Sequence, residues 1–371
     1  MRSMRTVLPF LFSLLFGGSV QAQWWTVQTS GIDTNLRGVS VARLSEAKGV
    51  AAFAVWASGS NGVILKSIDE GKTWKRLHVA GGDALDFRGI VAFNSTTAYV
   101  MSSGEGEKSR IYKTTNGGET WNLQFTDKRK EFFLDSIACL SEAHCFALSD
   151  PIDGEFLILK TRDGEHWNAL PSDHMPKALP GEGAFAASNT CFLLSGEKIF
   201  FGTGGPAARL FRSPDSGRIW TVVETPIARG NASSGIFSIA RGTGKKIVVA
   251  GGDYQDPKRT SGVAAYSLDE GQTWQLSNEQ PGGYRSSVAR VKDSLLAAVG
   301  PNGEDISQDF AAHWKHADSL NLNAVAFLDV RTGWAVGPKG TIARFVHQSG
   351  FEIHYRGLRR ERRPATSAIA D

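Results

Sequence analysis

The strongest constraint on the fold of this chain is an eight-residue motif that returns along most of its length. In one copy, residues 67–74, it reads Ser-Ile-Asp-Glu-Gly-Lys-Thr-Trp. Three further copies keep these residue types and spacing, one is a residue shorter, and one is decayed; they occupy residues 114–121, 213–220, 267–274, 161–167 and 307–314. The motif tryptophans lie 40 to 54 residues apart. A period of about 20 to 50 residues is typical of an array of similar units.

The residues around each copy repeat as well. A short apolar run precedes the motif, as in residues 62–66, and another follows its Trp, as in residues 221–223. Two more β-like runs lie earlier in each unit, for example 89–93 and 98–101. Helical periodicity is absent throughout. Each unit is therefore expected to hold four short strands, which is the sequence signature of a propeller blade.

The units predict an all-β fold, a seven-bladed β-propeller. Six motif copies give six blades. A seventh unit begins at residues 322–327 and has no motif and no fourth strand, whereas residues 24–28 resemble the strand that follows a motif Trp. We expect this N-terminal strand to complete the last blade and close the ring, because closure removes the free sheet edges. The propeller is predicted over residues 23–348.

The first 22 residues have the layout of a secretory signal peptide. Arg2 and Arg5 precede an apolar stretch, and Val20-Gln-Ala22 provides small residues for cleavage near Ala22. The apolar stretch is too short to cross a bilayer as a mature helix, although an uncleaved anchor is the alternative. The protein is expected to be exported, to the periplasm or the extracellular space.

Residues 349–371 are predicted to form a basic, flexible tail. Five arginines lie between residues 356 and 363, and removing residues 356–371 together with the leader lowers the formal net charge from +4 to about −1. The basic balance therefore belongs to the ends of the chain and not to the ring. The tail is either a solvated end without function or an attachment to acidic lipid headgroups or to a client protein.

The motif itself is interpreted as scaffold. Its Asp can accept hydrogen bonds from backbone N–H groups of a turn, its Gly suits a positive φ, its Ser or Thr caps the turn, and its Trp packs between blades. The structural pairs are Asp69 and Trp74, Asn116 and Trp121, Asp163 and Trp167, Asp215 and Trp220, Asp269 and Trp274, and Asp309 and Trp314. Trp24 or Trp25 is expected to serve the seventh blade, and Trp56 and Trp334 also look structural.

These features resemble a known group of proteins. The motif is similar to the BNR/Asp-box repeat of sialidases and other secreted propellers. The Thr-Thr-Asn-Gly-Gly-Glu-Thr-Trp copy at 114–121, the Gly-Trp-Ala-Val-Gly run at 333–337 and the Trp-rich opening strand are closer to the photosystem II stability/assembly factor family. The resemblance covers residues 24–346. It implies a non-catalytic propeller on the lumenal or periplasmic side that helps to assemble a membrane protein complex, in photosynthesis or in bacteria without it.

A binding site is expected where the first strands of the units begin, at the rim of the central opening. The residues aligned there are Arg37, Arg88, Asp135, Arg285 and Asn323; units four and five are small or uncertain, near Gly183 and Ser234. Three arginines on one rim suit the capture of carboxylates, and Lys128, Arg129 and Lys130 would add charge. The alternative is three separately paired, structural arginines. Replacing all three is expected to abolish partner binding and leave folding intact.

Enzymatic chemistry finds less support. A sialidase would use its arginines with a Tyr nucleophile that is supported by a Glu. Tyr284 and Glu279 are candidates for these roles, but the Arg-Ile-Pro type motif is missing. The chain has no dinucleotide-binding fingerprint, no nucleophile elbow and no His spacing typical of a metal site. No catalytic residue, cofactor or metal is therefore predicted, and His313 and His316 are taken as surface residues.

The three cysteines are too few for a disulfide scaffold. Cys139 and Cys145 flank a predicted hairpin turn and either pair in an oxidising compartment or remain buried thiols. Cys191 would stay single. We interpret the chain as an exported, monomeric protein-binding or assembly factor for a membrane or envelope complex, without nucleic acid. The alternative is an exo-glycosidase that acts on extracellular glycans.

Overall fold

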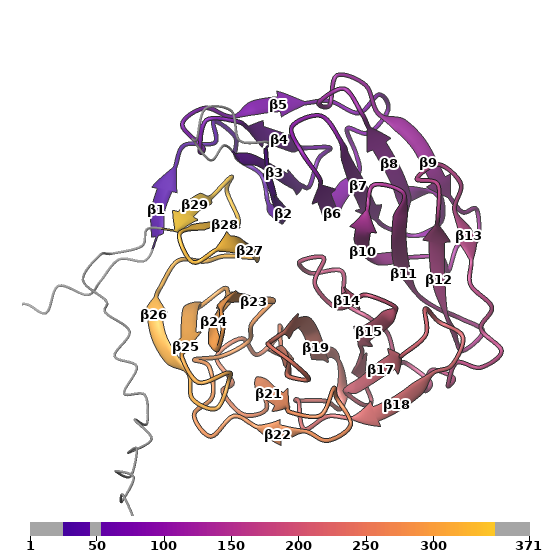
Figure 1. Ribbon diagram of the computed structural model, residues 1–371, viewed down its shortest axis with the longest axis vertical. Helices are drawn as coiled ribbons and strands as arrows, with labels where there is room; N and C mark the ends of the chain where they lie inside the picture. Colours follow the sequence, from indigo (N-terminus) through magenta and orange to yellow (C-terminus); the bar gives the residue numbers. More distant parts are fainter. Residues whose placement is uncertain (1–24, 45–52, 346–371) are drawn as a thin grey trace, which may run out of the picture.

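The computed structural model describes residues 25–44 and 53–345, which form a ring of seven antiparallel sheets around a central axis (Figure 1). The predicted seven-bladed β-propeller is confirmed. In each sheet one strand lies nearest the axis, namely β2, β6, β10, β14, β19, β23 or β27, and in the last sheet β1 lies at the outside (Figure 1). The predicted leader and tail, with Trp24, lie outside the described residues. Within the described ranges no helix is long and apolar enough to cross a membrane.

The strands of blades one to four are, in sheet order, β2 (Leu36–Arg43), β3 (Phe53–Gly59), β4 (Ile64–Ser67) and β5 (Lys75–Leu77); β6 (Asp86–Ala92), β7 (Ala98–Ser103), β8 (Arg110–Thr114) and β9 (Asn122–Thr126); β10 (Leu134–Ser141), β11 (His144–Ile152), β12 (Glu155–Thr161) and β13 (Asn168–Ala169); and β14 (Phe192–Ser195), β15 (Lys198–Gly202), β17 (Arg209–Ser213) and β18 (Thr221–Glu224).

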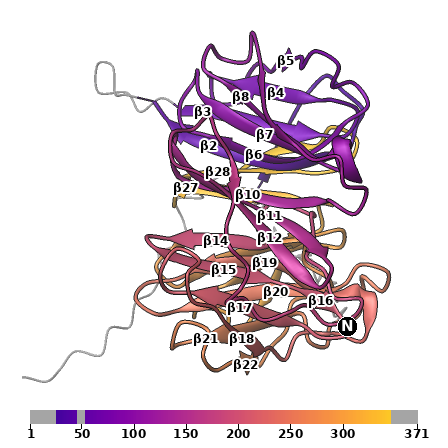
Figure 2. The ribbon, with the colours of Figure 1, turned by 90° about the vertical axis from the view of Figure 1, so that its right-hand side faces the viewer.

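Those of blades five to seven are β19 (Asn231–Arg241), β20 (Ile247–Asp253), β21 (Ala264–Ser267) and β22 (Gln275–Leu276); β23 (Ser287–Lys292), β24 (Leu295–Gly300), β25 (Gly303–Ser307) and β26 (Lys315–Asp318); and β27 (Ala324–Asp329), β28 (Thr332–Val336) and β29 (Ile342–Phe345). A two-residue strand, β16 (Gly204–Gly205), pairs with β19 and lies at one face of the ring (Figure 2). One short 3-10 helix, η1 (Gly106–Lys108), precedes β8.

The N-terminal strand β1 (Trp25–Gln28) closes the ring. It pairs antiparallel with β29, with Trp25 opposite Phe345, so that the last sheet has the order β1-β29-β28-β27. The Trp25 side chain is fully buried, and its Nε1 donates a 2.6 Å hydrogen bond to Glu304 of the sixth blade. One side chain thus joins the strand that completes blade seven to blade six.

Each motif copy forms a hydrogen-bonded turn between the third and fourth strands of its blade, as expected. In the first copy, Ser67 Oγ accepts from the Gly71 N–H at 2.8 Å and donates to Asp69. The Asp69 carboxylate also accepts from the Thr73 N–H at 3.0 Å and from the Thr73 hydroxyl at 2.6 Å. These bonds, chiefly the one from the Thr73 side chain, lower the pKa of Asp69 to about 2. The turn is therefore satisfied within the motif and needs no ligand.

The glycine and tryptophan positions of the motif also have structural roles. Gly71 has φ +79, and a Cβ there would lie 2.0 Å from Gln28 Oε1, so both conformation and space require glycine. The motif tryptophans were expected to pack between blades. Trp167, Trp220 and Trp314 are buried, whereas Trp74, Trp121 and Trp274 are partly buried.

The disulfide, one of the two alternatives for the cysteines, is formed in the structure. Cys139 and Cys145 are directly opposed on β10 and β11, with their Cα atoms 4.0 Å apart. Cys191 is a buried free thiol.

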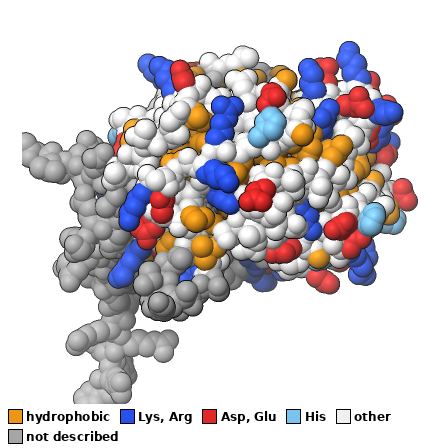
Figure 3. Space-filling model, turned by 90° about the horizontal axis from the view of Figure 1, so that it is seen from above, with side chains coloured by type: hydrophobic (Ala, Val, Ile, Leu, Met, Phe, Trp, Pro, Cys, Tyr) orange, Lys and Arg blue, Asp and Glu red, His pale blue; other side chains and the backbone are white. Residues whose placement is uncertain are grey.

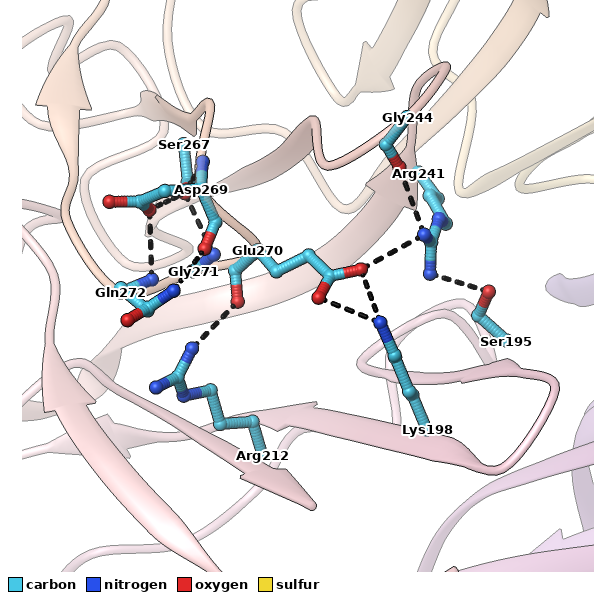
Figure 4. Close-up of polar contacts among 10 residues, drawn as sticks. All are labelled: Ser195, Lys198, Arg212, Arg241, Gly244, Ser267, Asp269, Glu270, Gly271 and Gln272. Carbon is cyan, nitrogen blue, oxygen red and sulfur yellow. Dashed lines mark hydrogen bonds and ion pairs between the residues drawn. The ribbon is translucent and has the colours of Figure 1, made fainter. Parts of the chain in front are cut away.

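A charged network joins the fourth and fifth blades (Figure 4). Glu270, in the fifth-blade motif, accepts hydrogen bonds from Lys198 at 2.6 and 2.7 Å and from Arg241 at 3.1 Å. Arg212 of the fourth blade donates to its backbone carbonyl at 3.1 Å. Hydrogen bonding from Lys198 is the largest cause that lowers the pKa of Glu270. The motif turn thus holds the neighbouring blade through its side chain and its backbone.

The variant Glu270→Gln should lower the free energy of unfolding by about 1–2 kcal/mol at neutral pH, because two charge-assisted contacts are lost from a partly exposed site. The lowered pKa means that this contribution is complete above the ordinary Glu pKa and disappears as the pH falls below it. Urea denaturation at pH 7 and pH 3 measures both effects. Glu197→Gln, at an exposed position without an ion pair in the structure, is the matched control. Equal effects of the two variants at pH 7 would contradict the prediction.

Candidate functional site

A cavity of about 1130 Å³ opens at the centre of one face of the ring. It is lined by the beginnings of first strands and by the loops that lead into them, including β16 at the face seen in Figure 2. The outer wall in Figure 3, by contrast, carries positive and negative side chains interspersed with apolar ones. We call this space the central cavity.

Bulges at the starts of the first strands aim three predicted residues at the central cavity. In β2, Leu36 pairs with Gly59 and Gly38 pairs with Ser58, so that Arg37 is the extra residue between them. Arg88 in β6 and Asp135 in β10 occupy the same bulged position. A bulge redirects the side chain of the unpaired residue. All three line the central cavity, and so does Asn323 just before β27.

Arg285, the fifth predicted rim residue, lies elsewhere. The strand pairing counted from the sixth-blade motif places Ser287 at the position of Gly38, so that the rim residue is Ser286. Ser286 lines the central cavity and Arg285 does not. The Arg285 side chain is fully buried, where it forms an ion pair with Asp305 and donates to the Tyr284 carbonyl at 2.9 Å. Two consecutive serines made the sequence alignment ambiguous by one residue, and one residue reverses the side of a strand.

The fifth blade contributes an aromatic residue that the sequence interpretation missed. Its pairing places Phe237, not Ser234, at the bulged rim position. The Phe237 ring stacks on Phe185 at a centroid distance of 3.8 Å and contacts Tyr284 edge-on at 4.7 Å. Counting back from the fifth motif, instead of searching for a small residue, would have found it. The central cavity therefore has an aromatic wall.

The two remaining arginines of the rim share one carboxylate. Arg88 Nε lies 2.7 Å from Asp86 Oδ2, and Arg37 Nε lies 3.8 Å from Asp86 Oδ1. The Arg37 Nε is buried and has no hydrogen-bond acceptor. Burial is the main cause, and Arg88 the next, that lowers the pKa of Arg37. The single carboxylate of Asp86, which is partly buried, cannot neutralise both guanidinium groups, so positive charge is available to a ligand.

An acidic pair lies in another part of the wall. Asp135 is fully buried, and Asp150 of β11 accepts a 2.8 Å hydrogen bond from the Ala184 N–H. Burial, followed by the charge of Asp150, raises the pKa of Asp135 well above its ordinary value, and burial raises the pKa of Asp150 to about 6. Asp150, Phe185 and Tyr254 were not predicted, because they come from a strand end and from loops outside the repeat.

The predicted basic loop contributes less than expected. Arg129 is exposed and pairs with Asp127 at 2.7 Å, and neither it nor Lys128 lines the central cavity. Glu131 and Phe133, from the same loop, do line it. The loop therefore places an acid and an aromatic ring at the cavity wall, where positive charge was predicted.

A family model described as Photosynthesis system II assembly factor YCF48 matches residues 56–282. The chain belongs to this family. Solved structures of similar fold include one of YCF48 bound to D1 peptide, with TM-score 0.62, 14% identity and coverage of 89% of this chain and 99% of that one. Another is of YCF48 from Cyanidioschyzon merolae, with TM-score 0.60, 15% identity and coverage of 87% and 99%. No curated protein matches the chain.

This is a family of assembly factors and not of glycosidases. Consistent with that, the structure does not bring together the pair considered for sialidase chemistry. Tyr284 lines the central cavity, whereas Glu279 lies outside it and accepts from the Trp314 N–H at 3.1 Å through its backbone carbonyl. Burial raises the pKa of Tyr284, which is opposite to what an activated nucleophile needs. Over the described ranges, no group of three side chains is placed to hold a metal ion.

Proposed function

We propose that this chain is an exported, non-catalytic assembly factor whose central cavity binds a peptide segment of a membrane or envelope protein through a carboxylate. The observation that carries the proposal is the arrangement of Arg37 and Arg88, which share Asp86 while the Arg37 Nε has no acceptor. A guanidinium with free donors favours a planar carboxylate, which can accept two parallel hydrogen bonds.

The size and the lining of the central cavity support a peptide as ligand. Pockets for drug-sized molecules measure about 300–1,000 Å³, and this one is larger, at about 1130 Å³. Tyr254 and Tyr284 present apolar rings with hydroxyl groups, a combination that is common where proteins bind peptides. The similar fold of YCF48 bound to D1 peptide supports the same class of ligand for this chain. Export rests on the predicted leader and is part of the proposal.

The double variant Arg37→Gln/Arg88→Gln should bind the client about 10- to 100-fold more weakly, because charge-assisted hydrogen bonds to one carboxylate are lost. Crosslinking in native membranes, followed by mass spectrometry, would identify the client. Overlapping peptides from its sequence, titrated against both proteins, then measure the affinity.

Arg76→Gln/Arg162→Gln is the matched control, since it removes the same charge from exposed positions outside the cavity. It should bind like the wild type, and thermal melts should show all three proteins folded. Undiminished binding by the rim variant would refute the proposal. Release of a fluorescent aglycone from sialoside or hexoside substrates by the wild type would favour the glycosidase alternative instead.

A further inference from the structure

The central cavity has a second pole, of opposite charge to the arginine pair. We infer that Asp135 and Asp150, together with the neighbouring aromatic rings, form a subsite for an organic cation, the ammonium or guanidinium group of a Lys or Arg side chain in the bound peptide. This inference rests on the proposed function, because it adds a second recognised group to the peptide that the cavity is proposed to bind.

The first observation is an unpartnered buried carboxylate. Asp135 lines the cavity wall with no exposed side-chain surface, and neither of its carboxylate oxygens has a hydrogen-bond donor. The backbone amide of the neighbouring Asp150 donates to the Phe133 carbonyl at 2.9 Å. A buried polar group without a partner costs free energy of folding, and natural proteins rarely keep one that nothing satisfies.

The second observation is the incomplete pairing of Asp150. Its Oδ1 accepts from the Ala184 N–H at 2.8 Å, and its Oδ2 has no donor among the described residues. Asp150 is only partly buried and lines the same cavity, so it is the member of the pair that a ligand reaches first. With both oxygens of Asp135, three acceptors in one wall are without donors.

The groups facing the pair do not neutralise it. The positive charge of Arg88 on β6 acts to lower the pKa of Asp135. The Arg88 side chain nevertheless donates its hydrogen bonds to Asp86 and to the Ala186 carbonyl. The residue before β14 is Cys191, whose thiol stays neutral because burial raises its pKa. Without a ligand both acids are therefore protonated more readily than an ordinary aspartic acid, since burial raises the pKa of Asp135 and raises that of Asp150 to about 6.

The surroundings select an organic cation and not a metal ion. The loop that donates its Ala184 amide to Asp150 carries Phe185 next in sequence, and the Phe185 ring stacks on Phe237 at 3.8 Å. Both rings line the cavity that contains the two carboxylates, and aromatic rings attract ammonium and guanidinium groups through cation–π contact but supply no metal ligand. With Arg37 and Arg88 in the same cavity, the preferred peptide carries an acidic group and a basic side chain a few residues apart.

Methylguanidinium chloride is a direct probe, with sodium chloride at equal ionic strength as its reference. Carbon-detected NMR of aspartate-labelled protein should show saturable shifts of the Asp135 and Asp150 carboxyl signals. The affinity should fall at least tenfold between pH 7.5 and pH 5, because protons compete for the same oxygens. Asp135→Asn should weaken binding at least tenfold, whereas Asp173→Asn, at an exposed position outside the cavity, should not.

Non-saturating shifts, an affinity that does not change with pH, or equal affinity for Asp135→Asn and wild type would overturn the inference. Asp135→Asn removes an unpaired acid, so its thermal stability should match or exceed that of the wild type. The arginine variants separate the two proposals. If the arginine variants lose the client and methylguanidinium does not bind to the wild type, only the cation subsite is wrong. If methylguanidinium binds to the wild type and the arginine variants retain the client, only the carboxylate site is wrong.

Discussion

Replacing Arg285 by methionine should lower the free energy of unfolding by about 3–5 kcal/mol. The guanidinium is fully buried, with Nε 2.8 Å from Asp305 Oδ2 and Nη2 paired with the same atom. Asp305, itself buried, would keep only the Gly282 N–H at 3.0 Å and a distant His316. A buried carboxylate that loses its cation is left charged in a medium of low polarity, which is far more costly than losing the pair as a whole.

That distinction provides the test. The double variant Arg285→Met/Asp305→Leu removes both charges and should recover most of the lost stability. Arg290→Met, at an exposed position on β23, should change the free energy of unfolding by less than about 0.5 kcal/mol. Urea denaturation followed by tryptophan fluorescence measures all three. A loss below about 1 kcal/mol for Arg285→Met would contradict this prediction. It would instead agree with the expectation from the sequence, in which Arg285 lies at the rim and its replacement leaves folding intact.

The second large effect is expected at the closure of the ring. Trp25→Ala should cost about 3–5 kcal/mol, because a fully buried indole is removed from contact with Phe327 and Phe345, whose ring centroids lie 6.0 and 5.5 Å away. The variant also removes the hydrogen-bond donor of Glu304, whose other carboxylate oxygen already lacks a partner. Burial raises the pKa of Glu304 to about 8, and the Trp25 donor opposes that shift.

Three variants on β1 separate these contributions. Trp25→Phe keeps most of the apolar volume and loses the donor, so it should cost about 1–3 kcal/mol. Val27→Ala, at a half-exposed position on the same strand, should cost less than about 0.5 kcal/mol. Loosening β1 exposes the edge of β29, so Trp25→Ala should also form larger species in size-exclusion chromatography. A monomeric Trp25→Ala variant with wild-type stability would mean that closure does not depend on this strand.

Much of the fold could be predicted because the motif is satisfied locally. Ser67, Asp69 and Thr73 bond within their own turn, so their spacing is visible in the sequence wherever the turn recurs. The candidate site was predictable only in part. Arg37, Arg88, Asp135 and Asn323 were placed at the central cavity by alignment, but the same alignment placed Arg285 there, one residue from the correct position.

The amino-acid sequence alone determined the number of blades, the closure of the last blade by the N-terminal strand and the role of the repeated turn. Only the tertiary structure decided which side chains meet in the central cavity. Asp150 and Ala184, or Phe185 and Phe237, lie 34 and 52 residues apart, and no local pattern connects them. The physical reason is that a strand alternates its side chains between two sides and each bulge shifts that alternation by one, so the pairing of whole strands must be known before a side chain can be assigned to the rim or to the core.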